Sequence, residues 1–128
     1  MSDQTDRVVV EVPLDEKYGH LLRLAVSGIG LRMDYTYDDI EDLKLAVDEA
    51  YLLAIRGSGN DGRTAVEFLV HPDRMEILFR GVHPEALSED RGDMESFGLF
   101  LIQGVMDEVD FPQQKGGDVL RMVKLLKK

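Results

Sequence analysis

Glu49 lies within residues 38–56, a stretch with helical periodicity, and is the acidic side chain best placed to do chemistry. It is off the main apolar stripe, on a helical face shared with Leu45, Leu53 and Arg56. A carboxylate on such a half-apolar face can act as a general base or lie beside a bound metal ion. The alternative is a partly solvated acid near an arginine, which sequence patterning alone favours.

None of the other polar motifs predicts a catalytic site. Residues 57–62, GSGNDG, follow a helix instead of opening one, so we interpret them as a turn and not as a phosphate-binding loop. His20, His71 and His83 have no metal-ligand spacing, and we predict no metal site. The absence of cysteine excludes thiol catalysis, disulfides and cysteine-ligated metals. No GxSxG, Walker, GxGxxG or HExxH motif occurs.

The element that must position Glu49 is a helix over residues 38–56. Its apolar residues recur at helical spacing and form one stripe, made up of Ile40, Leu43, Val47, Ala50, Tyr51 and Ala54. Asp38 or Asp39 is the expected N-cap, and Arg56 followed by Gly57 is the expected end. The stripe predicts a helix that packs on the core.

Two further helices are expected. Residues 14–31 have helical apolar spacing and should fray at Gly28 and Gly30. Residues 96–106 are apolar nearly all round, which predicts a helix buried against a sheet. Between them, residues 81–95 form the least regular segment, which we interpret as a lid, a partner-binding loop or plain disorder.

The remaining segments read as strands, and together the elements predict the fold class. Residues 71–74 form a hairpin connection between two antiparallel strands. The expected strands are residues 8–12, 64–70, 75–80, 109–111 and 119–126. The order β, α, α, β, β, α, β, β predicts an α+β two-layer sandwich, with a mostly antiparallel sheet covered by helices on one face.

Length and composition indicate one acidic domain over residues 1–128. The chain has 44% hydrophobic and 31% charged residues and a net charge of -10. This charge opposes contact with nucleic acid or anionic lipid and suits a basic protein partner, although it also serves plain solubility. The polar N-terminus and the lack of an apolar run of membrane length predict a soluble cytoplasmic protein.

Three stretches stand out, in the order LKLAVDEAYLLAI, SFGLFLIQGVMDEVDF and GGDVLRMVKLL. Together they resemble the bacterial anti-sigma factors that are also serine-protein kinases, and the resemblance covers roughly residues 5 to 128. This family belongs to the ATP-binding superfamily of histidine kinases and gyrase. The resemblance implies a histidine kinase-like ATPase fold and a homodimer. It also implies binding to a sigma factor or, alternatively, to an anti-anti-sigma partner whose serine the family phosphorylates with Mg-ATP.

The resemblance also implies where the nucleotide chemistry would lie. The family's acid, which helps to activate the attacking hydroxyl, matches Glu49, but its Mg²⁺-binding asparagine four residues on is Leu53 here. The family's adenine-reading aspartate and the glycine two residues later match Gly81 and His83.

The last family motif, glycine-any-glycine before a helix, matches Ser96 and Gly98, so only Gly98 is retained. We interpret these positions as a degenerate nucleotide site. Glu85 or Asp90 can substitute from the loop if the alignment around Gly81 is shifted by a residue or two.

We therefore expect an anti-sigma-like regulator that acts by partner switching, with weak or absent ATP binding and no resident cofactor. The alternative is an active serine-protein kinase that uses ATP and Mg²⁺, and a third interpretation is a dimeric scaffold that binds no sigma factor. Glu89, Asp90 and Asp93, in the acidic loop, are the candidate partner-binding residues.

Overall fold

The structure is a computed structural model that describes residues 4–58, 62–82, 93–113 and 118–127. Its elements follow the predicted order, with a short 3-10 helix added before the first α-helix. They are β1 (Asp6–Pro13), η1 (Glu16–Tyr18), α1 (Gly19–Arg32), α2 (Tyr37–Ser58), β2 (Arg63–Val70), β3 (Arg74–Arg80), α3 (Asp93–Val105), β4 (Glu108–Asp110) and β5 (Val119–Leu125).

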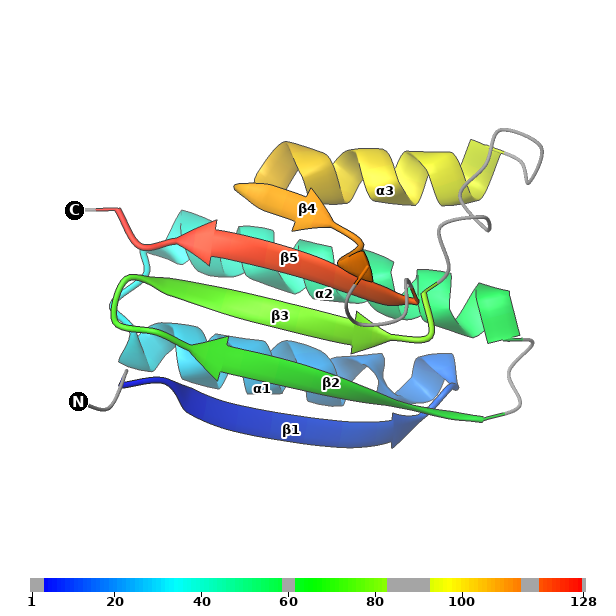
Figure 1. Ribbon diagram of the computed structural model, residues 1–128, viewed down its shortest axis with the longest axis horizontal. Helices are drawn as coiled ribbons and strands as arrows, with labels where there is room; N and C mark the ends of the chain where they lie inside the picture. The colour runs from blue at the N-terminus through cyan, green and yellow to red at the C-terminus, as the bar shows by residue number, and fades with distance from the viewer. Residues whose placement is uncertain (1–3, 59–61, 83–92, 114–117, 128) are drawn as a thin grey trace.

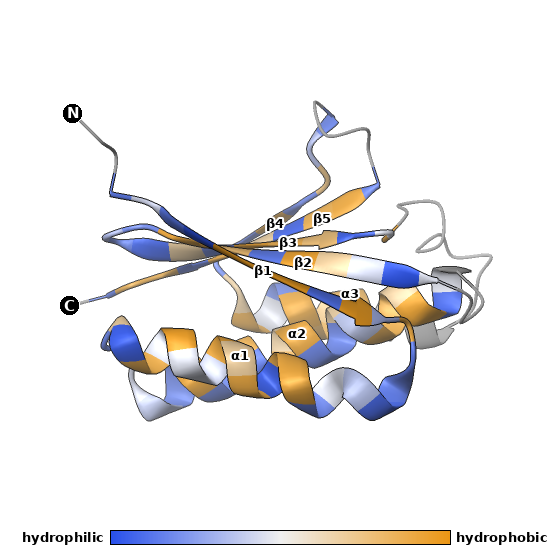
Figure 2. Ribbon diagram, turned by 90° about the horizontal axis from the view of Figure 1, so that it is seen from below, coloured by the Kyte–Doolittle hydropathy of each residue, from blue (hydrophilic) through white to orange (hydrophobic). Residues whose placement is uncertain are grey.

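The strands form one antiparallel sheet in the order β1-β2-β3-β5-β4 (Figure 1). The hairpin β2–β3 pairs Val70 with Met75, as the turn residues predicted. Seen along the sheet, all three α-helices lie on one face (Figure 2). The predicted α+β two-layer sandwich is confirmed.

The core lies between the sheet and α2. Alternate residues of β2 and β3 face the helices, and among them Val66, Phe68, Ile77 and Phe79 are fully buried. The predicted stripe of α2 packs on them, since all six of its residues are buried. Burial of this stripe orients the rest of α2, and with it Glu49.

The predicted ends of the first two helices were partly wrong. The side chain that caps α2 is Thr36, whose Oγ1 accepts a hydrogen bond from the amide of Asp39 at 3.1 Å, and not Asp38 or Asp39. Helix α1 does not fray at its glycines but continues to Arg32. At Gly30, a Cβ would lie 3.3 Å from Cγ1 of Ile40, so the missing side chain lets α1 approach α2 closely.

The prediction for the third helix was wrong in its surroundings. It starts at Asp93, inside the segment we expected to be loop, and it packs mainly beside α2 and not under the sheet. Ile102 is buried, but Phe97 and Phe100 are 58% and 67% exposed and stack on each other with ring centroids 6.4 Å apart. An apolar composition indicated burial, but the partner in this structure covers only one side of the helix.

The sheet face opposite the helices carries ion pairs between charged side chains. Glu67 contacts Arg7 at 2.5 Å and Arg80 at 3.3 Å, and Glu76 contacts Arg121 at 2.6 Å. His71, expected to be structural or exposed, lies between Thr5 at 2.9 Å and Glu76 at 3.0 Å. Within the described residues, none of the helices is both long and apolar enough to cross a membrane.

Candidate functional site

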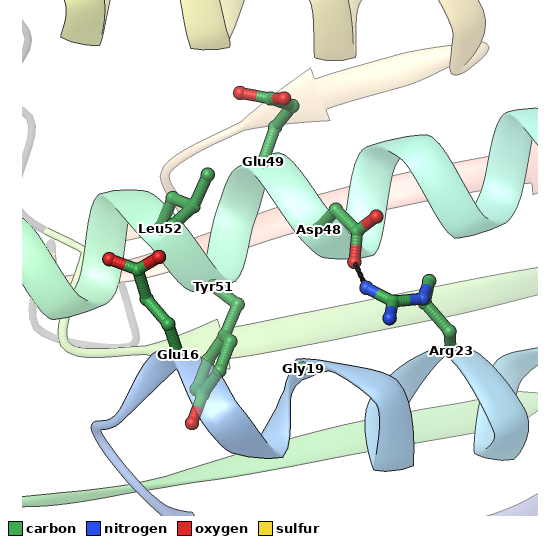
Figure 3. Close-up of a pocket in the computed structure, with 7 residues that line it drawn as sticks. All are labelled: Glu16, Gly19, Arg23, Asp48, Glu49, Tyr51 and Leu52. Carbon is green, nitrogen blue, oxygen red and sulfur yellow. Dashed lines mark hydrogen bonds and ion pairs between the residues drawn. The ribbon is translucent and has the colours of Figure 1, made fainter.

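Helix α2 places its two neighbouring acids on different sides. It packs against α1 on one side and against α3 on the other. Asp48 faces α1, where Nη1 of Arg23 donates to its Oδ1 at 2.8 Å. Glu49, one residue on and therefore rotated by about 100°, points toward α3 (Figure 3).

Glu49 lies at the contact between α2 and α3 and shares a cavity lining with Arg23. It is half-buried, and a Cβ on Gly98 of α3 would lie 3.2 Å from its Oε1. The arginine that joins this acidic pair is Arg23, and it pairs with Asp48 and not with Glu49. Glu49 is therefore a carboxylate held at a helix–helix contact, with one side open to a cavity.

That cavity has a volume of about 250 Å³ and lies between the start of α1 and α2 (Figure 3). Its lining residues are Glu16, Gly19, Arg23, Asp48, Glu49, Tyr51 and Leu52. Three of them are carboxylates and one is a guanidinium, so the cavity repels the phosphates of a nucleotide and suits a neutral or cationic polar group. Glu49 is the one candidate site residue in this lining.

Tyr51 shapes one wall of the cavity. Its hydroxyl shares its one proton between the carbonyl oxygens of Pro13 and Asp15, at 2.5 and 2.7 Å, and accepts from the amide of Asp15 at 3.2 Å. Burial raises the pKa of the Tyr51 hydroxyl, which keeps it a neutral donor. Tyr51 therefore ties the segment between β1 and η1 to α2. The sequence placed it only as a core residue.

The positions matched to the family's nucleotide site lie along the C-terminal half of α2. Leu53 is 4% exposed, and its Cδ2 would lie 3.8 Å from a Cβ on Gly98. Gly81 has a φ of +84°, its amide donates to the carbonyl of Asp118 at 2.9 Å, and its own carbonyl oxygen would lie 3.9 Å from a Cβ on Gly57. Folding thus brings Leu53, Gly81 and Gly98, which are far apart in the sequence, to the C-terminal half of α2.

The other candidate residues are described in part or not at all. Ser96 lies in the first turn of α3, and Asp93 is its first residue. His83, Glu89 and Asp90, together with the alternative Glu85, lie outside the described residues.

The residues present do not fit Mg-ATP in the family's manner. Leu53 has no oxygen and belongs to the hydrophobic core, and Gly81 has no side chain to read an adenine. Of the matched positions whose side chains are described, Glu49 alone supplies an oxygen ligand. The described part of the chain also contains no group of three or more His, Cys, Asp or Glu side chains arranged to hold a metal ion.

Sequence reasoning missed Arg23, Glu16 and the cavity they share with Glu49. Arg23 lies 25 residues from its partner Asp48, so no local spacing links the two. The available signal was only that a polar face of the helix over residues 14–31 had no assigned role.

Comparison with known proteins shows which family the sequence matches. Residues 12–124 match the model of the histidine kinase-like ATPase domain. The chain is 34% identical to the serine-protein kinase RsbW of Bacillus pumilus, covering 98% of this chain and 90% of that protein. It is 31% identical to the protein of the same name from Bacillus subtilis, covering 98% of this chain and 89% of that protein. It is 30% identical to the protein of the same name from Listeria monocytogenes, covering 94% of this chain and 88% of that protein.

Proposed function

Because the chain belongs to the histidine kinase-like ATPase family and is related within it to the RsbW serine-protein kinases, we propose that it regulates transcription by partner switching. In this role it binds a sigma factor and, alternately, an anti-anti-sigma partner. It acts in the cytoplasm as a homodimer, and its nucleotide binding is weak or lost. The observation that carries the proposal is the similarity along nearly the whole chain.

The loss of nucleotide binding is supported by the contact between α2 and α3. Leu53 and Gly98 are packed together where the family has a Mg²⁺ ligand and a phosphate-binding glycine motif. Each lost polar contact to a ligand costs about 1 to 3 kcal/mol. Two such losses weaken binding roughly a hundredfold or more.

The surface of the protein suits binding to a basic protein. The net charge of -10 attracts a cationic partner and speeds association. Phe97 and Phe100 add an exposed apolar pair on α3, on either side of Gly98 in the sequence. Aromatic side chains of this kind carry much of the affinity in protein interfaces, whereas rim charges contribute little individually.

The second candidate function is an active serine-protein kinase. It is favoured by Glu49, which is retained at the family's catalytic position and borders an open cavity that admits a small polar side chain. A kinase requires Mg-dependent ATP binding and phosphate transfer to a partner serine, and a binding regulator requires neither. A dimeric scaffold, the third interpretation, binds no sigma factor.

The experiment that separates these functions is capture of partners from native lysate with and without Mg-ATP, with identification by mass. We expect a sigma factor in the captured fraction under both conditions. Titration calorimetry with Mg-ATP should show binding weaker than low micromolar. Capture that requires ATP, or low-micromolar Mg-ATP affinity, would establish the kinase instead. Failure to capture any sigma factor at low salt would favour the third interpretation, a dimeric scaffold that binds no sigma factor.

A further inference from the structure

The C-terminal end of α3 is attached to β5. The Nζ of Lys124 donates to the carbonyl oxygen of Val105, the last residue of the helix, at 2.7 Å. Asp107 follows closely and is held twice: its amide donates to the carbonyl of Val123 at 2.9 Å, and its Oδ2 accepts from the amide of Leu125 at 2.7 Å. These hydrogen bonds fix this end of the helix against the sheet.

Lys124 is the centre of this attachment. Its side chain is only 8% exposed, and its Nζ also lies 3.2 Å from Oδ2 of Asp42 and 3.8 Å from Oδ1 of Asp39, in the first two turns of α2. The last carbonyl groups of a helix carry a partial negative charge, and α3 has no basic residue in its own last turn. Lys124 therefore supplies the charge that this helix end lacks, and it joins β5, α2 and α3 at one point.

The N-terminal half of α3 lacks comparable anchors. Within the described residues, no hydrogen bond or ion pair joins residues 97–101 to another element. Phe97 and Phe100 are mostly exposed, whereas the large buried side chains, Ile102 and Met106, lie in the C-terminal half or just after it. Local stability depends on buried apolar contacts and hydrogen bonds, so the N-terminal half is the less stable part of the helix.

The contact that closes this half onto α2 is formed at Gly98. A Cβ there would lie 3.2 Å from Oε1 of Glu49 and 3.8 Å from Cδ2 of Leu53. Because Gly98 has no side chain that interlocks with α2, the two helices can separate here without a change of rotamer in α3. The cost of separation is mainly the exposure of Leu53, which is buried in the closed state.

We propose that α3 is a hinged helix, which turns about the attachment at Lys124 and swings its N-terminal half away from α2. A helix that is fixed at one end and loosely packed at the other parts from its neighbour by rotation about the fixed end. The open state uncovers Leu53 and Glu49 beside the exposed phenylalanines of α3. A partner that binds this surface shifts the population toward the open state. The role in partner binding rests on the proposed function, whereas the motion itself does not.

Thiol labelling tests the motion, because the chain has no native cysteine. Leu53→Cys is compared with Val47→Cys, at a fully buried position of α2 that faces the sheet. The thiol at position 53 should react about tenfold faster or more, because local opening is more frequent than global unfolding. Its rate should hardly depend on low urea concentrations, whereas the rate at position 47 should rise steeply, since global unfolding exposes much more surface. Equal rates with the same steep urea dependence overturn the hinge.

A thiol near the fixed end distinguishes rotation about Lys124 from detachment of the whole helix. Ile102→Cys, at a fully buried position of α3, should react as slowly as Val47→Cys. Labelling that is as fast at position 102 as at position 53 shows detachment and overturns the hinge. If circular dichroism shows that Ile102→Cys does not fold, Met106→Cys reports on the same end of the helix.

The attachment itself is tested by Lys124→Met, which keeps an unbranched side chain and removes the charge. Added to Ile102→Cys, it should raise labelling at position 102 about tenfold and make the rate nearly independent of urea. A protein that is merely less stable keeps the steep urea dependence, and this result overturns the role assigned to Lys124. The matched control is Lys127→Met, which removes the same charge from an exposed ion pair with Asp107 and should leave the rate unchanged.

A disulfide connects the motion with partner binding. In a variant that combines Leu53→Cys with Gly98→Cys, the two side chains are adjacent in the closed state, since Cγ of Leu53 would lie 3.9 Å from a Cβ on Gly98. The oxidised form should capture sigma factor about tenfold more weakly than its own reduced form. Equal capture by the two forms overturns the role of the open state in binding. Failure of the unchanged protein to capture any sigma factor counts against the proposed function and not against the hinge, which thiol labelling tests without a partner.

Discussion

At the residue scale, Tyr35 joins the helical layer to the sheet. Its hydroxyl donates to the carbonyl of Lys124 on β5 and accepts from the amide of Met75 on β3 at 3.0 Å. Burial, the largest cause, raises the pKa of Tyr35 to about 12. One neutral hydroxyl thereby links the loop before α2 to two adjacent strands.

Replacing Tyr35 by Phe should lower the free energy of unfolding by about 1 to 3 kcal/mol at neutral pH, because two buried backbone groups lose their partner. The pKa is raised in the folded state, so the stabilisation is complete below the ordinary value of 10.0 and is lost as the pH rises toward about 12. The difference between the two proteins in urea unfolding should shrink over that range. Tyr37→Phe, at an exposed position, is the control. A constant difference would contradict the assignment.

Leu53→Asn tests the nucleotide position directly. The change puts an amide into a core position against Gly98, and we expect a loss of about 2 to 5 kcal/mol in unfolding free energy. It should not restore Mg-ATP binding, because no adenine contact is regained at Gly81. Leu52→Asn, at a half-buried neighbour beside the open cavity, should cost much less. Tight Mg-ATP binding by the Leu53 variant would show that this single residue blocks the site.

At the element scale, the outer sheet face depends on ion pairs in place of a second layer of helices. Burial disfavours the charged form of Glu76, but hydrogen bonds from Arg121 and His71 outweigh it and lower the pKa of Glu76. The stability that this carboxylate provides is therefore present above its ordinary pKa of 4.5 and is lost as the pH falls through the lower folded value.

Glu76→Gln should destabilise the protein by about 1.5 to 3 kcal/mol at neutral pH, since charge-assisted hydrogen bonds to two partners become weaker. Below pH 4.5 the unchanged protein should lose this advantage, and the two unfolding curves should converge. Glu41→Gln, at an exposed pair on α2, is the control and should have little effect at either pH. Curves that stay equally far apart in acid would show that the ionised carboxylate is not the cause.

The helices also show what sequence patterns can and cannot predict. The α2 stripe was predictable because six residues at one period can only face one core. The N-cap at Thr36 was not predictable from the sequence. Thr36, Asp38 and Asp39 all have a side-chain oxygen that can accept from a helix amide, and the backbone geometry selects Thr36. The exposure of Phe97 and Phe100 was not predictable either, because composition does not reveal which neighbour covers a helix. For the site, helical spacing placed Glu49 and Leu53 correctly on one face. Their contact with Gly98 arises from packing between distant segments.

At the scale of the whole molecule, the charge of -10 should govern encounter with a basic partner. We expect association with a captured sigma factor to slow as ionic strength rises, with a smaller change in dissociation. Reversing Glu89, Asp90 and Asp93 together to lysine should slow association without unfolding the protein.

The control for that experiment reverses Asp38, Glu41 and Asp73, which gives the same change in total charge at other places. If both triple variants slow association equally, total charge is responsible and the acidic segment has no special role. If neither triple variant slows association, electrostatic attraction does not drive the encounter with the partner.

The position of β5 inside the sheet, and not at its edge, has a consequence for folding kinetics. It lies between β3 and β4, and its ladder with β3 joins Arg74 to Leu125 and Arg80 to Val119. Residues so far apart in sequence meet only after a large loss of chain entropy, so this pairing should form late. Until then, β3 has an open edge, and the folding intermediate carries the aggregation risk that the finished sheet confines to its edge strands, β1 and β4.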